Sequence, residues 1–227
     1  GQTIAQLYSN TSGGLIKIIS PEQRLVVSRR TIYNQGLDEI SAVSRDDLDE
    51  EIYFSWYDLA SAGFSGDWIM VSNPNYTAAN VDIIIAGTKR GSYTIAAGKT
   101  EPVVYAKLMG GPVEIKCTNA LKIFASQRVL YNGTFNEVVG VPKKRLSTAV
   151  YFPWYDETAN SGITSDFLLI SNPADSEAKV DVYIGQTKKG SYTIAPHSAV
   201  APRYTGSFGG LVKVLSVNQV PIFASQR

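Results

Sequence analysis

The stretch YFSWYD at residues 53–58 returns as YFPWYD at residues 151–156. Four further blocks return in the same order: DWIMVSNP (67–74) as DFLLISNP (166–173), GSYTIA (91–96 and 190–195), a Gly-Gly pair (110–111 and 209–210) and IFASQR (123–128 and 222–227). Chance does not produce five ordered blocks at near-constant spacing, so the chain contains a repeat of about 98 residues.

A third, more diverged copy opens the chain and is represented by its second half. Gly13-Gly14 matches Gly110-Gly111, VVSRR (26–30) matches FASQR (124–128), and IYNQGLDEI (32–40) matches LYNGTFNEV (130–138). We therefore divide the chain into a partial module at 1–30, a first repeat at 31–128 and a second repeat at 129–227. The chain begins at Gly1 rather than at Met, which is expected of a processed protein or a fragment.

Within one repeat the apolar runs are short, rich in β-branched and aromatic residues, and separated by turn residues. DWIMVSNP, for example, ends at Asn73-Pro74, where proline cannot continue a strand ladder. About seven strands per repeat predict an all-β protein of tandem immunoglobulin-like antiparallel β-sandwich modules. A barrel with a similar number of strands is the alternative.

Taken together, the blocks WYD, SNP, GSYTI, GG and IFASQRVLYNGTFNEV resemble β-sandwich repeats found in secreted and cell-surface proteins of bacteria and some archaea. The resemblance covers essentially the whole chain. It implies an extracellular structural or adhesive role, and it carries over no catalytic residue.

The bulk composition argues against several classes of partner. The formal net charge is +1, which gives no general electrostatic attraction to nucleic acid or to an anionic membrane. No apolar run is long enough to span a membrane. Cys117 is the single cysteine and therefore forms no intramolecular disulfide.

The single histidine and the single cysteine, residue types that often act in catalysis, are each replaced by another residue at the equivalent position of the other repeat. His197 is the single histidine and takes the place of Gly98, as expected of a loop residue, while Cys117 takes the place of Ser216. A catalytic triad or a histidine metal site needs partners that this pattern does not offer. We predict no enzymatic activity, no catalytic residue, no metal site and no cofactor.

An acidic stretch, RDDLDEE at 45–51, is aligned with the basic residues 143–145 of the next copy. A solvated linker is the favoured interpretation, and calcium binding through carboxylate oxygens is the alternative. Opposite charges at equivalent places could also set the register between neighbouring repeats.

The YF-WYD blocks, with Trp56 and Trp154, lie on predicted short strands. Because strand residues alternate between two faces, at least half of these aromatic side chains belong to a core. We favour a core or an interface between modules, and an aromatic platform for carbohydrate is the alternative.

Two pairs of charged residues stand in the best-kept blocks. Asp58 accompanies Arg128 in one repeat, and Asp156 accompanies Arg227 in the other. We predict that each arginine bonds a carboxylate or backbone carbonyls near its own aromatic block, as a structural clamp. Arg30 is the counterpart of Arg128 without a preceding aspartate, so its partner is expected from another subunit.

These features favour a non-enzymatic extracellular structural protein whose partner is itself. Residues 1–30 contain the strand-like runs LIKIIS (15–20) and RLVVSRR (24–30), which predict head-to-tail assembly into a filament or surface layer by strand complementation. An adhesin or carbohydrate-binding module that recognises cell-surface glycans is the alternative. Asn10, Asn75 and Asn132 each begin an N-x-Ser/Thr sequon and are candidate glycosylation sites.

Overall fold

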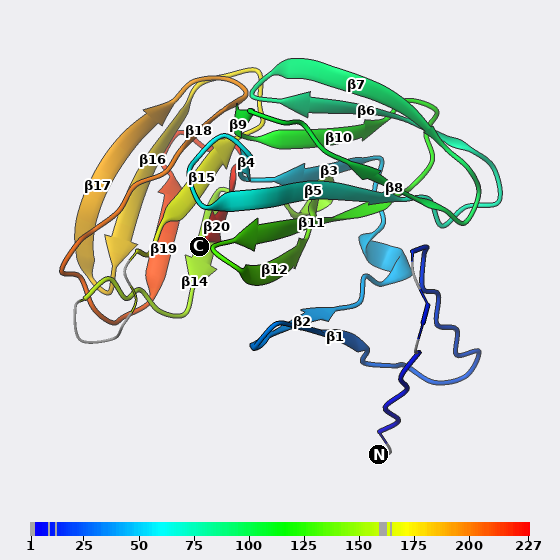
Figure 1. The fold of residues 1–227 in the computed structure, drawn as a ribbon. Helices are drawn as coiled ribbons and strands as arrows, with labels where there is room; N and C mark the ends of the chain where they lie inside the picture. Colours follow the sequence, from blue (N-terminus) through cyan, green and yellow to red (C-terminus); the bar gives the residue numbers. More distant parts are fainter. Residues whose placement is uncertain (1–2, 9, 12, 159–162, 164) are drawn as a thin grey trace.

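The computed structural model describes residues 3–8, 10–11, 13–158, 163 and 165–227. Within these ranges the protein is all-β, as predicted, with several antiparallel sheets and two 3₁₀ turns, η1 (Arg45–Asp47) and η2 (Lys143–Arg145). Figure 1 shows two groups of sheets side by side, one from each repeat. In the described part of the chain, no helix has the length and apolar character needed to cross a membrane.

The first repeat forms two main antiparallel sheets that share one core, an arrangement consistent with a β-sandwich. One sheet has the order β13 (Val141–Pro142), β3 (Glu51–Phe54), β10 (Val113–Cys117), β6 (Ala79–Ile85), β7 (Thr88–Ile95). The other has the order β12 (Thr134–Val139), β11 (Phe124–Tyr131), β5 (Phe64–Ser72), β8 (Thr100–Val103). A short pair, β4 (Tyr57–Asp58) with β9 (Met109–Gly110), lies beside them.

The second repeat arranges its equivalent strands in the same order. One sheet runs β14 (Ala149–Phe152), β19 (Val212–Ser216), β16 (Ala178–Ile184), β17 (Thr187–Ile194). The other runs β18 (Ser198–Val200), β15 (Leu168–Asn172), β20 (Phe223–Gln226). A separate hydrophobic core fills the space between them, so each repeat buries its own apolar side chains.

Alternation of side chains explains why these segments form strands. In β6 and in β16 every second residue is buried, and the burial pattern is the same in both. The intervening residues face outward, which is the period expected of a strand with one face on a core. Each of these strands also has a register shift in its pairing with the next strand, just before a turn that contains glycine. The two repeats therefore match in local backbone geometry as well.

The N-terminal segment differs from the predicted one. β1 (Ser28–Tyr33) pairs with β2 (Gly36–Ser41) as a separate hairpin, and β2 packs beside β12. The run at 15–20 forms no strand, and its isoleucine side chains are exposed. The predicted boundaries after residues 30 and 128 fall inside β1 and β11, because each hairpin continues past its arginine before it turns. β12 and β13 accordingly complete the sheets of the first repeat.

Candidate functional site

A buried polar network ties the aromatic block of each repeat to its IFASQR strand. Gln127 Nε2 donates to Asp67 Oδ1 and to the Trp56 carbonyl, each at 2.8 Å. The backbone N–H of Asp58 donates to Asp67 Oδ2, also at 2.8 Å. The second repeat makes the same bonds with Gln226, Asp166, Trp154 and Asp156. These polar groups therefore have structural partners in both repeats.

The electrostatics of this network centre on Asp67, whose side chain is fully buried. Burial raises the pKa of Asp67 to about 6, because removal from water disfavours the charged carboxylate. Hydrogen bonds from Asp58 and Gln127 and the positive charge of Arg227 act in the opposite direction. Arg227 thus carries its charge near Asp67 of the first repeat, whereas the clamp prediction placed it near Asp156 of its own repeat.

Arg128 does bond a carboxylate, but its partner is Glu137 of the neighbouring strand rather than a group of the aromatic block. Asp58 Oδ1 accepts hydrogen bonds from two backbone N–H groups of the following turn. Arg128 Nε donates to Glu137 Oε2 at 2.8 Å, directly across the β11–β12 pair. Neighbouring residues of a strand point to opposite faces, so Gln127 rather than Arg128 faces the aromatic block.

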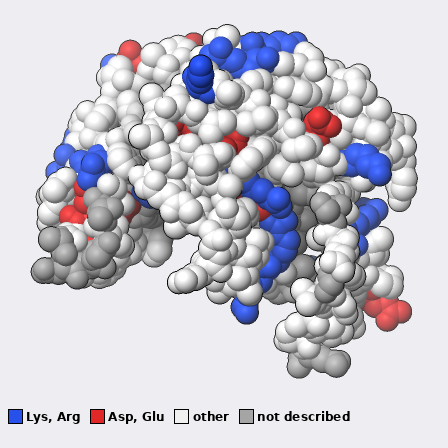
Figure 2. Space-filling model, viewed as in Figure 1, with Lys and Arg blue, Asp and Glu red and all other residues white. Residues whose placement is uncertain are grey.

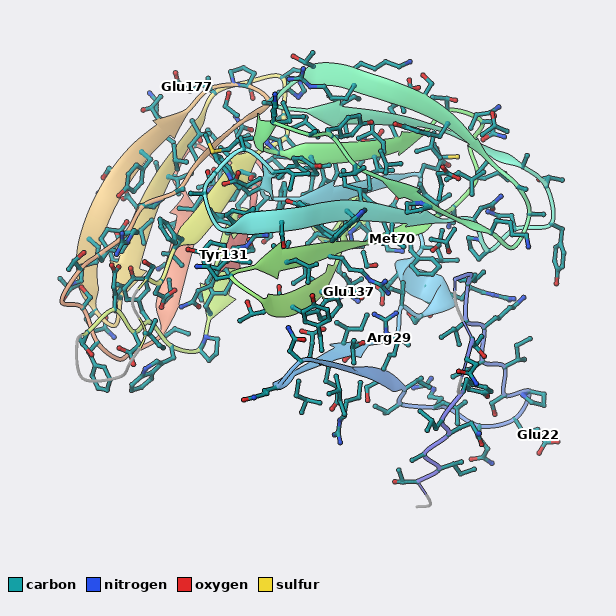
Figure 3. All side chains as sticks on the ribbon, in the orientation of Figure 1. Glu22, Arg29, Met70, Tyr131, Glu137 and Glu177 are labelled. Atoms are coloured by element: carbon teal, nitrogen blue, oxygen red, sulfur yellow. The ribbon has the colours of Figure 1, made fainter. Side chains whose placement is uncertain are left out.

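Glu137 is buried and pairs with two arginines, one from the β1–β2 hairpin and one from β11. Arg128 and Ser126 donate to it, and Arg29 of the β1–β2 hairpin forms an ion pair with it. Figure 3 shows Arg29 and Glu137 facing each other between the hairpin and β12. Burial alone raises the pKa of Glu137, but these hydrogen bonds and positive charges outweigh it and leave the pKa below its ordinary value.

Arg30 has a partner within its own hairpin. Its guanidinium donates from Nη2 to Glu39 Oε2 at 2.8 Å. Arg30 and Glu39 face each other across the hairpin as Arg128 and Glu137 do in the first repeat. The prediction of a partner from another subunit is therefore wrong, because the register of the hairpin supplies the carboxylate.

A packed junction joins the two repeats. The ring of Tyr53 lies against that of Phe223 with centroids 5.6 Å apart. Ser171 Oγ donates to the Ser55 carbonyl at 3.0 Å, and the hydroxyl groups of Ser55 and Ser225 are hydrogen-bonded. Together with strand β13, which pairs with β3 beside Tyr53, these contacts leave Tyr53 only 3% exposed. Trp56, beside it, is half-buried.

Two residues of the same block in the second repeat are open to solvent. Tyr151 is 57% exposed, against 3% for its counterpart Tyr53, and Trp154 is 49% exposed, whereas its counterpart Trp56 is half-buried. The Trp154 ring contacts the Phe208 ring edge to face, with centroids 5.3 Å apart. Phe208 is itself 63% exposed, so both rings of this pair face solvent.

A hollow of about 440 Å³ lies on the first repeat, near the linker that follows the β1–β2 hairpin. We call it the Phe124 hollow, after the half-buried ring in its lining. Most of its other lining is aliphatic: Ile40, Val43, Ile52, Val138, Val139, Val141.

The two 3₁₀ turns bind each other, so the acidic stretch at 45–51 has partners in the chain. Arg145 Nη2 pairs with Asp47 Oδ1 at 2.5 Å, and Lys144 Nζ donates to the Leu48 carbonyl at 3.1 Å. Figure 2 shows that charged side chains elsewhere on the viewed face form small separate groups, including a basic one over β7. No cluster of metal-binding residues is found among the described residues.

His197 lies at the contact between repeats, in the loop after β17. A Cβ added to Gly87 of the first repeat would stand 3.1 Å from the His197 Cβ. Its Nε2 is 2.8 Å from Asp175 Oδ1. Cys117 is buried in β10, 3.2 Å from Asn119 Oδ1, as expected of a small strand residue.

The sequons have different surroundings. Asn75 Nδ2 already donates to Asn73 Oδ1 and to the Lys122 carbonyl, at 2.8 and 2.9 Å. Asn132 lies in the turn between β11 and β12. Ser12, the last residue of the Asn10 sequon, lies outside the described residues.

Comparisons with known proteins add little to this geometry. No protein-family model matches the chain, and no curated protein matches it. A fucolectin from striped bass (Morone saxatilis) serum is 10% identical with a TM-score of 0.21, covering 71% of this chain and 75% of the lectin. A structure of the M60 catalytic domain with the CBM51-1 and CBM51-2 domains of Clostridium perfringens ZmpB is 9% identical with a TM-score of 0.23. That match covers 92% of this chain and 38% of the ZmpB chain. At such scores neither similarity carries an argument.

Proposed function

We propose that this protein is a non-enzymatic structural protein of the cell exterior, built from tandem immunoglobulin-like β-sandwich modules that dock in series. The junction between the repeats carries this proposal. Tyr53, Ser55 and Phe223 form a specific side-chain interface, whereas modules on a flexible tether would leave these groups in water.

A second point of attachment supports a rigid series of modules. His197 of the second repeat lies beside Gly87 of the first repeat, in addition to the ring contact of Tyr53 with Phe223. Two separated contacts restrict both bending and rotation between modules. A rod of fixed geometry suits a stalk, filament or surface layer, and the resemblance of the blocks to repeats of secreted and cell-surface proteins supports a place outside the cell.

Head-to-tail self-association belongs to the same proposal, with one change of mechanism. Strand complementation requires free strands at the N-terminal end, but β1 and β2 already pair with each other over six residues. We therefore place the contact between copies on side-chain faces of folded modules rather than on a donated strand.

Carbohydrate binding is the second candidate, favoured by the exposed rings of Trp154 and Phe208. Flat aromatic side chains in water can stack on the apolar face of a sugar ring. A glycan array probed with the protein and with Trp154→Ser tests it directly: binding that Trp154→Ser abolishes would establish an adhesin or lectin role.

Two measurements test the structural function: the rigidity of the junction between the two repeats, and the location of the protein inside or outside the cell. Small-angle X-ray scattering should fit one fixed arrangement of the two repeats, and Phe223→Ser should broaden it. Tyr76→Ser, which removes an aromatic ring that is 91% exposed away from the junction, is the control and should leave the scattering unchanged. Equal flexibility of all three proteins, or immunogold labelling confined to the cell interior, would overturn the proposal.

A further inference from the structure

We propose that the outer face of the β6–β7 strand pair in the first repeat binds a neutral carbohydrate through side chains that are already held in place. A groove of about 320 Å³ lies on this face, at the β7 edge of the sheet (Figure 1). We call it the Asp82 groove. Its polar side chains are Asn80, Asp82, Lys89, Ser92, Thr94 and Thr118.

The first step is the direction of these side chains. Asn80 and Asp82 alternate in β6 with buried residues of the core, so they point away from the core. Across the strand pair, Thr94 lies directly opposite Asn80, and Ser92 lies directly opposite Asp82. Two neighbouring strands therefore present their polar side chains to one groove.

The second step is that hydrogen bonds between these side chains fix their positions. Ser92 Oγ donates to Asp82 Oδ1 at 2.7 Å, and Thr94 Oγ1 donates to Asn80 Oδ1 at 3.0 Å. Lys89 Nζ forms an ion pair with Asp82 Oδ2 at 2.8 Å. Side chains that are already ordered lose less conformational freedom when a ligand binds, which favours recognition.

The third step is the hydrogen-bonding capacity that remains unused. Within the described part of the chain Asn80 Nδ2 has no hydrogen-bond partner, so both of its N–H groups can donate to a ligand. Each carboxylate oxygen of Asp82 accepts one bond and has a lone pair for a second. The groove thus offers donors and acceptors together, as the hydroxyl groups of a sugar require, because each hydroxyl group both donates and accepts.

The fourth step is charge. The hydrogen bonds from Lys89 and Ser92 hold the pKa of Asp82 below its ordinary value, so this carboxyl group is charged at neutral pH. The ammonium group of Lys89 offsets that charge within the groove. A neutral ligand fits this balance better than an anionic or a cationic one.

The second repeat provides a contrast within the same chain. Asp181 makes the same bonds there, to a serine at 2.7 Å and to a lysine at 2.8 Å. However, Lys179 stands in place of Asn80, and Val217 stands in place of Thr118. Since this face lacks the free amide and one hydroxyl group, we assign the carbohydrate site to the first repeat alone. The site goes beyond the proposed function, because it uses neither the junction between the repeats nor the exposed aromatic rings of the second repeat.

Nuclear magnetic resonance of the isotope-labelled whole chain tests the inference. The probes are neutral oligosaccharides of glucose, galactose, mannose and N-acetylglucosamine, each titrated separately. At least one probe should shift the backbone amide signals of β6 and β7 until they saturate, with one site per chain. The signals of β16 and β17 should stay unchanged. A panel in which no probe shifts the β6 and β7 signals would overturn the inference.

Substitutions identify the groups that hold the probe. Asn80→Ala and Asp82→Ala should each weaken binding by at least about tenfold, a loss of about 1.4 kcal/mol. Asp181→Ala removes the equivalent carboxylate from the second repeat and is the matched control, so its affinity should equal that of the original chain. Asn80→Ala truncates an exposed side chain, so this variant keeps the test decisive if Asp82→Ala is unstable. Equal weakening by the substitutions at Asp82 and Asp181 would refute the assignment.

Two other results would contradict the inference. Loss of binding in Trp154→Ser would place the carbohydrate on the aromatic rings of the second repeat. Tighter binding of a uronic acid oligomer than of its neutral counterpart would refute the preference for a neutral ligand. Neither result alters the scattering test of the junction, so failure here is distinguishable from failure of the proposed function.

Discussion

Gln127 donates from a single side-chain nitrogen to both carboxylate oxygens of Asp67, at distances of 2.8 and 3.0 Å. The same nitrogen donates to the Trp56 carbonyl, and both side chains are buried. Strand β11 is thereby tied to β5 and to the aromatic block of the same repeat.

Removal of this amide should destabilise the first repeat strongly. Gln127→Ala leaves the buried Asp67 carboxylate without its side-chain donor, for which a loss of about 2 to 3 kcal/mol in the free energy of unfolding is expected. Urea unfolding followed by circular dichroism measures this loss. Gln127→Glu should be worse than Gln127→Ala near neutral pH, because it adds a second negative charge, and an equal or milder effect would contradict the role given to Asp67.

Asp67 should make stability depend on pH. Its pKa of about 6 in the folded state lies above the ordinary 3.8, so the folded state holds this proton more tightly. The free-energy cost of burying the charged Asp67 carboxylate is present in full above about pH 6. As the pH falls toward about 4 the folded state takes up the proton, and the free energy of unfolding rises by a total of about 3 kcal/mol. Unfolding of Asp67→Asn provides the reference: the stability of the original chain should rise relative to this variant as the pH is lowered. A constant difference would refute the raised pKa.

Arg128 and Arg30 offer a matched comparison of a buried and an exposed ion pair. Arg128→Ala leaves Glu137 buried with Arg29 as its remaining cation, and should lower the free energy of unfolding by about 2 to 3 kcal/mol. Arg30→Ala breaks a pair that is largely exposed, for which less than about 1 kcal/mol is expected. Chemical denaturation of the two variants checks this order, and a larger effect at Arg30 would contradict it.

Substitutions of Tyr53 and of Tyr151 should differ strongly in their effect on the free energy of unfolding, because the two side chains differ strongly in exposure. Tyr53→Ser removes a buried ring from the junction and should cost about 3 kcal/mol. Tyr151→Ser removes an open ring and should change the unfolding free energy by less than about 0.5 kcal/mol. Differential scanning calorimetry of dilute samples, in which copies remain separate, makes the comparison. Similar losses in both variants would mean that the junction does not protect Tyr53.

The repeat and the all-β class could be predicted from sequence because both are local properties of ordered blocks and alternating side chains. The partners of polar residues could not. Gln127 and Arg128 are neighbours in one block, and only the pairing of β11 decides which of them faces inward. Glu137 and Glu39 stand at matching places of the sequence, but the sequence does not identify them as the partners of arginines, since hairpin register depends on the turn. The different exposure of two identical tyrosines depends on a neighbouring module and on strand β13 beside Tyr53, and neither contact is visible in the local sequence pattern.

His197 offers a way to observe the junction in solution. The chain contains one histidine, and its imidazole stands beside Gly87 where the two repeats touch. Its ring protons should give one resolved pair of signals in a proton NMR spectrum, far from the aliphatic region. Changes in the position and width of these signals would report motion at the joint itself, with no label attached.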